Sequence, residues 1–191
     1  MIPLSRPVRW AAAALLLLSA AGCGLTGYLR DPFVDIPEFS QVTEDLYRGG
    51  VPKEAGYARL KALGVRTIID FRGVPEQGRP LPEAAQGFRR VSIPLSVYAW
   101  PEDEKALKFL QTVLDPEAHP VFVHCSSGRD RTGAMVAVYR VIVQEWGPKE
   151  AYREALAHGF WPYRGEVVLK KYIHQLRDRK VLYDFVRSRS K

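Results

Sequence analysis

The stretch VFVHCSSGRDRTGAMVAVYR, residues 121–140, places a cysteine and two arginines between two apolar runs. The first run is short and rich in valine, which predicts a buried strand. The second run begins near Thr132 and repeats its apolar side chains at helical spacing. The stretch therefore predicts a strand that turns into a helix, with Cys125 and the charges in the turn between them.

Strands and helices alternate outward from this stretch. We expect strands over 45–50, 65–71, 88–95 and 120–124, a loop over 72–82, and helices over 53–64, 101–114, 132–146, 147–159 and about 165–186. This alternation predicts an α/β fold of three layers, with a mostly parallel central sheet flanked by helices. Ligands bind at the carboxyl ends of the strands in such sheets, and Cys125 follows such an end.

The first 23 residues have a different composition. Arg6 and Arg9 precede an uncharged apolar run of 12 residues, too short for a bilayer-spanning helix, which needs about 20. A basic start, a short apolar run and small residues are typical of a secretory signal. The segment SAAGC, residues 19–23, resembles a bacterial lipobox, with Ala where Leu is commoner. An ordinary cleaved signal, with Cys23 an incidental thiol, is the alternative.

We therefore expect a lipoprotein-type signal peptide over 1–23, a tether over 24–40 and one domain over 41–191. Lipidation of Cys23 would anchor the chain to a membrane of a bacterial cell envelope, facing the periplasm or the exterior. The chain has only two cysteines, which excludes a disulfide framework. Cys125 is then either a buried packing residue or a functional free thiol.

The formal net charge of +7 has its excess concentrated in residues 164–191. Such a balance suits anionic lipid surfaces or phosphorylated substrates, but a solvated helix face is the explanation that we favour over a dedicated binding patch. We expect no nucleic-acid partner and a monomer.

The turn after the predicted strand has the composition of an anion-binding loop. Its backbone N–H groups can converge at a helix N-terminus, where orphan donors and the helix dipole both favour negative charge. That environment favours the thiolate of Cys125, which is the nucleophilic form. Arg131, six positions on, can pair two phosphate oxygens with its planar fork. The candidate phosphate-binding residues are Ser126, Ser127, Gly128, Arg129, Asp130 and Arg131.

The segment HCSSGRDRTG resembles the signature of the cysteine-dependent protein tyrosine phosphatase superfamily. VTEDLYRGGVP, LKALGVRTIIDFR and VSIPL resemble the early strands of its small dual-specificity branch, so the likeness covers about 39–159. The resemblance implies that Cys125 attacks phosphorus to form a phosphocysteine and that Arg131 binds the phosphate. It implies that Thr132 hydrogen-bonds the sulfur and that His124 orients the loop. It implies neither a metal nor a cofactor.

The general acid of that branch is missing from its usual place, three residues after a proline, where this chain has Val97. The segment WPEDE follows at once, and Glu102 and Asp103 are the candidate acids, although helix N-terminal charge explains them too. Asp130 is a further candidate that more plausibly fixes Arg129 or the loop backbone. If none of them serves, the enzyme relies on substrates with good leaving groups.

The segment GRDRT resembles the loop of bacterial phosphatases that act on phosphoinositides as well as phosphoproteins. The expected substrate is a phosphorylated protein, or a lipid or inositol phosphate. Arg129 would place a second cation beside the pocket and favour substrates with more than one phosphate. Arg48 and Arg72 end strands near the expected mouth; they either add positive field or form surface salt bridges, the reading we favour for Arg72.

Three alternatives remain at this stage. Cys125 is a buried core residue, or the chain is a rhodanese-like sulfurtransferase, which also uses a cysteine in an anion-binding loop. The third alternative is a catalytically weak pseudophosphatase module that binds phosphate, and Val97 motivates it.

Overall fold

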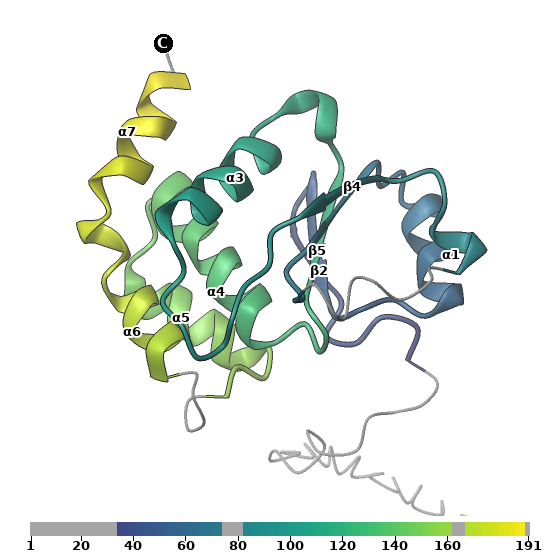
Figure 1. Cartoon of the computed structure of the whole chain (residues 1–191), viewed down its shortest axis with the longest axis horizontal. Coiled ribbons are helices and arrows are strands. Elements are labelled where there is room, and N and C mark those ends of the chain that lie inside the picture. The colour runs from purple at the N-terminus through teal and green to yellow at the C-terminus, as the bar shows by residue number, and fades with distance from the viewer. Residues whose placement is uncertain (1–33, 74–81, 162–166, 190–191) are drawn as a thin grey trace, which may run out of the picture.

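A five-stranded sheet forms the middle of three layers in the computed structural model, which describes residues 34–73, 82–161 and 167–189 (Figure 1). The strand order is β1-β2-β5-β3-β4. The strands are β1 (Ser40–Thr43), β2 (Leu46–Gly49), β3 (Thr67–Asp70), β4 (Arg89–Ser92) and β5 (Val121–His124). β1 pairs with β2 antiparallel, and the other three pairs are parallel. The predicted three-layer, mostly parallel α/β fold is confirmed.

Helices cover both faces of the sheet (Figure 1). One face carries α1 (Glu54–Ala62) and the 3₁₀ turn η1 (Glu83–Ala85). The other carries α3 (Asp103–Val113), α4 (Asp130–Val138), the π-helical turn η3 (Tyr139–Val143), α5 (Pro148–Ala157), α6 (Val167–His174) and α7 (Lys180–Arg189). Two further 3₁₀ turns are η2 (Pro116–Ala118) and η4 (Leu176–Asp178). Among the described residues, no helix combines the length and the apolar composition needed to cross a bilayer.

The central strand β5 shows how the sheet divides the core in two. Successive strand side chains point to opposite faces, so Phe122 packs with Tyr57 and Leu60 beneath α1. Val121 and Val123 pack on the other face, in the larger cluster formed with the helices α3 to α7. Because β5 is buried on both faces, its sequence is a continuous apolar run, the pattern that predicts a buried strand.

Three strands end level with one another at the edge that carries the cysteine. His124, the last residue of β5, lies opposite Gly49 of β2 and Asp70 of β3. Cys125 is the next residue, so it emerges between two neighbouring strand ends. The parallel register thus brings the residues that follow β2, β3 and β5 to one place.

The domain begins before the expected boundary at residue 41. Ile36 is 1% exposed and belongs to the core beneath α1, and Phe39 packs against the same cluster. The Pro37 carbonyl accepts a hydrogen bond from Gly50 N–H at 2.7 Å. The expected tether over 24–40 is therefore too long. The expected signal and the lipidation site at Cys23 lie outside the described residues and stay predictions.

Two of the expected helices are divided. The helix expected over 132–146 begins at Asp130 and changes from α4 to the π-helical η3 at Tyr139. The helix expected over about 165–186 is interrupted between α6 and α7 by η4 and by Arg179, whose ψ of 70° is not helical. The interruption lets Leu176 and Leu182, both fully buried, reach the core from different turns.

Candidate active site

The candidate site is the loop between β5 and α4, residues 125–131. Cys125 is a free thiol and only 1% exposed, immediately after the central strand. α4 begins at Asp130, so the N–H groups of its first turn face the loop without helical partners, as at any helix N-terminus. The local order of strand, cysteine loop and helix is the one expected from the sequence.

Glycines allow the loop to lie directly against the end of β2. Gly128 has a φ of +80°, a left-handed conformation that favours glycine. A Cβ at this position would lie 2.5 Å from both Gly49 C and Gly50 N. Val51 N–H donates to the Ser126 carbonyl at 3.3 Å, which adds a hydrogen bond between the same two segments. The backbone of β2 thus supports this part of the loop directly.

Arg131 reaches back across the loop. Its Nη2 donates to Ser126 Oγ at 3.0 Å, five residues earlier in the chain. The guanidinium and the thiol are thereby held on one short loop. The Thr132 hydroxyl donates to the Gly49 carbonyl at 3.4 Å, so in this state its recorded partner is that carbonyl and not the Cys125 sulfur. The expected hydrogen bond from Thr132 to sulfur stays a prediction.

His124 is fully buried behind the cysteine. Its Nδ1 donates to the Cys125 carbonyl at 3.2 Å, and its Nε2 lies 3.9 Å from Asp70 Oδ2. Burial lowers the pKa of His124 to about 4, although Asp70 opposes that shift, so the ring is neutral at neutral pH. A neutral ring that donates from Nδ1 to a carbonyl has its tautomer fixed by that hydrogen bond.

Arg72 forms a nearly buried ion pair rather than the surface pair favoured from the sequence. Its Nη2 lies 2.7 Å from Asp70 Oδ2, and the two side chains are 11% and 5% exposed. Burial raises the pKa of Asp70, but the hydrogen bonds and charge of Arg72, together with the charge that His124 carries when it is protonated, outweigh burial and bring it below its ordinary value. Arg72 thus stabilises the Asp70 carboxylate, and that carboxylate faces His124.

Arg48 lies beneath the loop and not at its mouth. The side chain is fully buried, and its Nη2 donates to the Gly128 carbonyl at 3.0 Å. Burial lowers its pKa to about 10, and the charges of Glu154, Cys125 and Glu38 oppose that shift. The sequence predicts Arg48 near the mouth, but all four residues of β2 are buried, which keeps its side chain inside.

The two charged residues in the middle of the loop have partners in other segments. Arg129 Nη2 and Nε each lie 3.2 Å from Glu38 Oε1. Asp130 Oδ1 accepts a hydrogen bond from Trp161 N–H at 2.7 Å, which ties the loop to the residues after α5. Glu38 and Trp161 were not expected at the site, because nothing local in the sequence relates them to residues so far along the chain.

The candidate acids also have partners. Asp103 Oδ1 lies 3.1 Å from Arg179 Nη1, and Glu102 Oε2 lies 3.3 Å from Lys105 Nζ. The Glu102 side chain is 62% exposed. Val97, at the usual acid position, packs against the larger core cluster. Which group protonates the leaving oxygen therefore stays a prediction.

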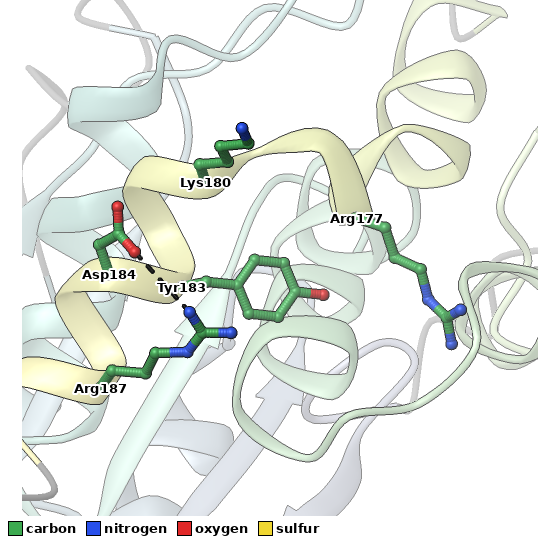
Figure 2. Close-up of a pocket in the computed structure, with 5 residues that line it drawn as sticks. All are labelled: Arg177, Lys180, Tyr183, Asp184 and Arg187. Carbon is green, nitrogen blue, oxygen red and sulfur yellow. Dashed lines mark ion pairs between the residues drawn. The ribbon is translucent and has the colours of Figure 1, made fainter.

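A separate hollow of about 370 Å³ lies along η4 and the C-terminal helix α7 and includes none of the loop residues (Figure 2). Arg177, Lys180, Tyr183, Asp184 and Arg187 line it. Arg177 and Lys180 point away from one another, and Arg187 faces Asp184 at 4.0 Å (Figure 2). These cations do not converge as an anion site requires. Within the described ranges, no group of three or more His, Cys, Asp or Glu residues is placed to hold a metal ion.

Residues 34–161 match a family model described as DSP-PTPase phosphatase fused to NAD+ kinase. Among curated proteins, the dual specificity protein phosphatase TpbA of Pseudomonas aeruginosa (strain UCBPP-PA14) is 31% identical over 131 residues, which cover 68% of this chain and 57% of TpbA. The inositol diphosphatase DSP4 of Arabidopsis thaliana is 32% identical over 122 residues, which cover 60% of each chain. The chain thus spans little more than half the length of these relatives.

A crystal structure of a cysteine-to-serine variant of Pseudomonas aeruginosa TpbA, in complex with phosphotyrosine, has a similar fold. Its TM-score is 0.64 at 23% sequence identity, and the superposition covers 82% of this chain and 94% of that one. At this identity the likeness shows the fold alone.

Proposed function

We propose, because the chain belongs to the family of DSP-PTPase phosphatases fused to NAD+ kinase, that it hydrolyses phosphate esters through a phosphocysteine at Cys125. The observation that carries this proposal is the loop itself. The free thiol of Cys125 lies at the end of the central strand, and Arg131 folds back over the same loop to Ser126. A nucleophile and a two-pronged phosphate ligand are thereby placed on seven consecutive residues, 125–131.

The reaction has two displacements at phosphorus. In the first, the Cys125 thiolate forms a sulfur–phosphorus bond while the bond to the leaving oxygen breaks, and that oxygen takes a proton. In the second, water attacks the phosphocysteine, the sulfur–phosphorus bond breaks, and phosphate and thiolate are released. Arg131 and the loop N–H groups stabilise the charge on the phosphoryl oxygens in both steps.

The substrate class follows from the partners of the acidic residues. Asp103, Glu102 and Asp130 are each engaged elsewhere, and Val97 replaces the usual acid. We therefore expect substrates whose leaving oxygen needs little protonation. A phenol has a pKa of about 10 and a phosphate monoester a second pKa of about 6, both well below that of an aliphatic alcohol. Phosphotyrosine and diphosphates thus suit the site better than phosphoserine.

Two of the relatives support this ranking. TpbA has been crystallised with phosphotyrosine, and the Arabidopsis relative is an inositol diphosphatase. Arg129 adds a second cation on the loop, which suits a substrate with more than one phosphate.

The test is phosphate release by the full-length chain from a phosphotyrosine peptide, a phosphoserine peptide, inositol mono- and diphosphates and phosphoinositides, from pH 4.5 to 8. Phosphotyrosine or diphosphate should exceed phosphoserine in kcat/KM by roughly 100-fold, the usual contribution of a general acid. Cys125→Ser should abolish release. Arg131→Lys should lower kcat/KM by roughly 100-fold, because a lysine cannot make the two-pronged contact.

Two results would contradict the proposal. Turnover that persists in Cys125→Ser would exclude the phosphocysteine. A folded wild-type chain that binds inorganic phosphate and hydrolyses no substrate would instead be a phosphate-binding pseudophosphatase, the alternative that Val97 motivates.

The proposed location is a bacterial envelope membrane, to which a lipid on Cys23 anchors the chain. The support is the lipobox-like segment over 19–23. Expressed in a bacterial host, the wild-type chain should incorporate labelled palmitate and sediment with membranes, and Cys23→Ala should do neither. Equal labelling of both chains would overturn the anchor and leave the phosphatase proposal untouched.

A further inference from the structure

Two arginine side chains are buried among the described residues, and they differ in how they are neutralised. Arg140 donates to Glu154 at 2.6 Å, to Gln144 Oε1 at 2.7 Å and to the Val42 carbonyl at 3.2 Å. It is a conventional buried cation, paired with a carboxylate and supplied with acceptors.

Arg48 has no such set of partners. Its one recorded hydrogen bond runs from Nη2 to the Gly128 carbonyl, and among the described residues Nε and Nη1 have no acceptor. The side chain is 0% exposed, so water does not compensate from the surface. Burying a cation with so few partners is costly, and its retention at a candidate active site calls for a functional reason.

Arg48 keeps its charge despite burial. Its pKa is lowered to about 10 by burial, which still leaves the guanidinium protonated at neutral pH. The charges of Glu154, Cys125 and Glu38 oppose the effect of burial. The cation therefore contributes a permanent positive field close to the nucleophile.

The position of Arg48 explains how it acts on the loop. In the sheet register it lies opposite Val123, two residues before Cys125. Its Nη2 would lie 3.8 Å from a Cβ built on Gly133, in the first turns of α4. The guanidinium thus lies between the end of β2, the loop and the start of α4.

The hydrogen bond to Gly128 also fixes the direction of a peptide group. In a trans planar peptide, the C=O and the following N–H point in opposite directions. Because the Gly128 carbonyl faces Arg48, the N–H of Arg129 points away from it.

We propose that Arg48 is a positioning residue. It turns the Arg129 N–H toward the bound phosphate and supplies a buried positive charge that the phosphate neutralises. The inference rests on the proposed function, since it assigns phosphate to the loop over 125–131. Arg48 acts through the backbone and through its field and does not touch the substrate.

The test is the affinity of the full-length chain, solubilised in detergent, for inorganic phosphate, measured by calorimetry at pH 7. Arg48→Gln and Arg48→Lys both retain a donor for the Gly128 carbonyl, but only lysine retains the charge. Arg48→Gln should weaken phosphate binding by about tenfold or more, with a thermal midpoint within about 3 °C of wild type. Arg48→Lys should bind within about threefold of wild type.

Arg140→Lys is the matched control, a buried arginine that keeps its charge and whose hydrogen-bond partners, Val42, Gln144 and Glu154, are not residues of the loop. It should lower the thermal midpoint and leave phosphate affinity within about twofold of wild type. A purely structural role for Arg48 predicts the same result for Arg48→Gln as for this control.

A folded Arg48→Gln chain that binds phosphate as tightly as wild type would overturn the inference. If Arg48→Gln fails to fold, Arg48→Lys decides alone: a folded chain that binds like wild type supports the role of the charge, and one that does not overturns it. Hydrolysis is not part of the readout. A wild type that binds phosphate without turnover would contradict the proposed function only, and normal phosphate binding by a folded Arg48→Gln chain would contradict the role of Arg48 only.

Discussion

Asp103 and Arg179 form an ion pair that ties the first residue of α3 to the turn before α7, with 3.1 Å between Oδ1 and Nη1. The same guanidinium lies 5.0 Å from the Trp100 ring centroid and 5.4 Å from that of Tyr172. The two rings meet edge to face at 5.5 Å. The segment that carries the candidate acids is therefore fastened to the helical layer by an arginine held between two aromatic rings.

Asp103→Asn and Arg179→Met should have similar effects, because each breaks the same ion pair. We expect each to lower kcat/KM by at most about fivefold, since partly exposed pairs contribute up to about 1 kcal/mol. The double variant should be little worse than either single one, as for any two residues that act through one contact. Steady-state kinetics on para-nitrophenyl phosphate from pH 4.5 to 8 measures all three.

The opposite pattern would identify Asp103 as the general acid. Asp103→Asn would then lower activity by roughly 100-fold or more, and its activity would no longer decline at high pH. Arg179→Met would keep both the activity and that decline. Glu102→Gln is the control, because its own exposed carboxylate lies against the half-buried Lys105 and outside this cluster.

Gly128→Ala should damage both stability and phosphate binding. A Cβ at this position would lie 2.5 Å from the backbone of Gly49 and Gly50, which neither segment can relieve by turning a side chain. We expect a loss of roughly 3 kcal/mol in the free energy of unfolding, at the upper end for overpacking, measured by urea denaturation. Phosphate binding should weaken with it.

Gly64→Ala is the matched control for that substitution. Gly64 has a similar φ of +74°, but a Cβ there meets nothing within 4 Å. It should cost about 1 kcal/mol for the left-handed conformation alone and leave phosphate affinity unchanged. Equal losses in the two variants would show that backbone conformation matters at Gly128 and that contact with β2 does not.

The free energy of unfolding should fall as the pH drops from about 6.5 to about 4. The pKa of His124 is about 4 in the folded chain, below its ordinary value of 6.5, so in this window the unfolded chain binds more protons. His124 alone accounts for about 3 kcal/mol over the window. Asp70, whose pKa is also lowered, adds a further loss at still lower pH.

His124→Asn should flatten this dependence, because the asparagine amide can donate to the Cys125 carbonyl without titrating. Urea denaturation at half-unit pH intervals measures the slope. A smaller slope should remain, since the pKa values of His158 and His174 are also lowered by burial. An unchanged slope in His124→Asn would mean that the buried ring is not its source.

Glu38 should limit how strongly the loop attracts a second phosphate. Its carboxylate lies 3.2 Å from two nitrogens of Arg129 and offsets that charge. Glu38→Gln should therefore raise kcat/KM for an inositol diphosphate relative to para-nitrophenyl phosphate by about threefold to tenfold, and Arg129→Met should lower the ratio. The monophosphate serves as the internal reference. A ratio that stays constant in both variants would exclude Arg129 from substrate selection.

The amino-acid sequence predicts those parts of the fold that depend on residues close together in the chain. β5 is a continuous apolar run because it is buried on both faces, and the loop after it is marked by Gly128 and by clustered charge. Such features depend on residues a few positions apart, which is why the amino-acid sequence alone predicts the three layers and the candidate nucleophile.

The remaining features depend on distant residues or on weak patterns. β1 is a four-residue edge strand in which only Val42 is buried, so it has almost no alternation to detect. Asp103 and Arg179 are 76 residues apart, and their pairing follows from packing rather than from periodicity. The sequence placed Arg48 at the mouth because charged side chains usually reach water, and the sheet register buries it beneath the loop instead.

The close approach of Gly128 to Gly49 and Gly50 implies that the site has two parts. The loop backbone packed against β2 forms a fixed floor, and the side chains around it form a rim that can change. The floor cannot widen unless β2 shifts with it. Substitutions in the floor should therefore alter the affinity for phosphate rather than the selection among phosphorylated substrates. Selection among substrates is left to surrounding side chains that have room to change. Arg129, which pairs with Glu38 beside the loop, is the place where we expect close relatives of this chain to diverge in substrate.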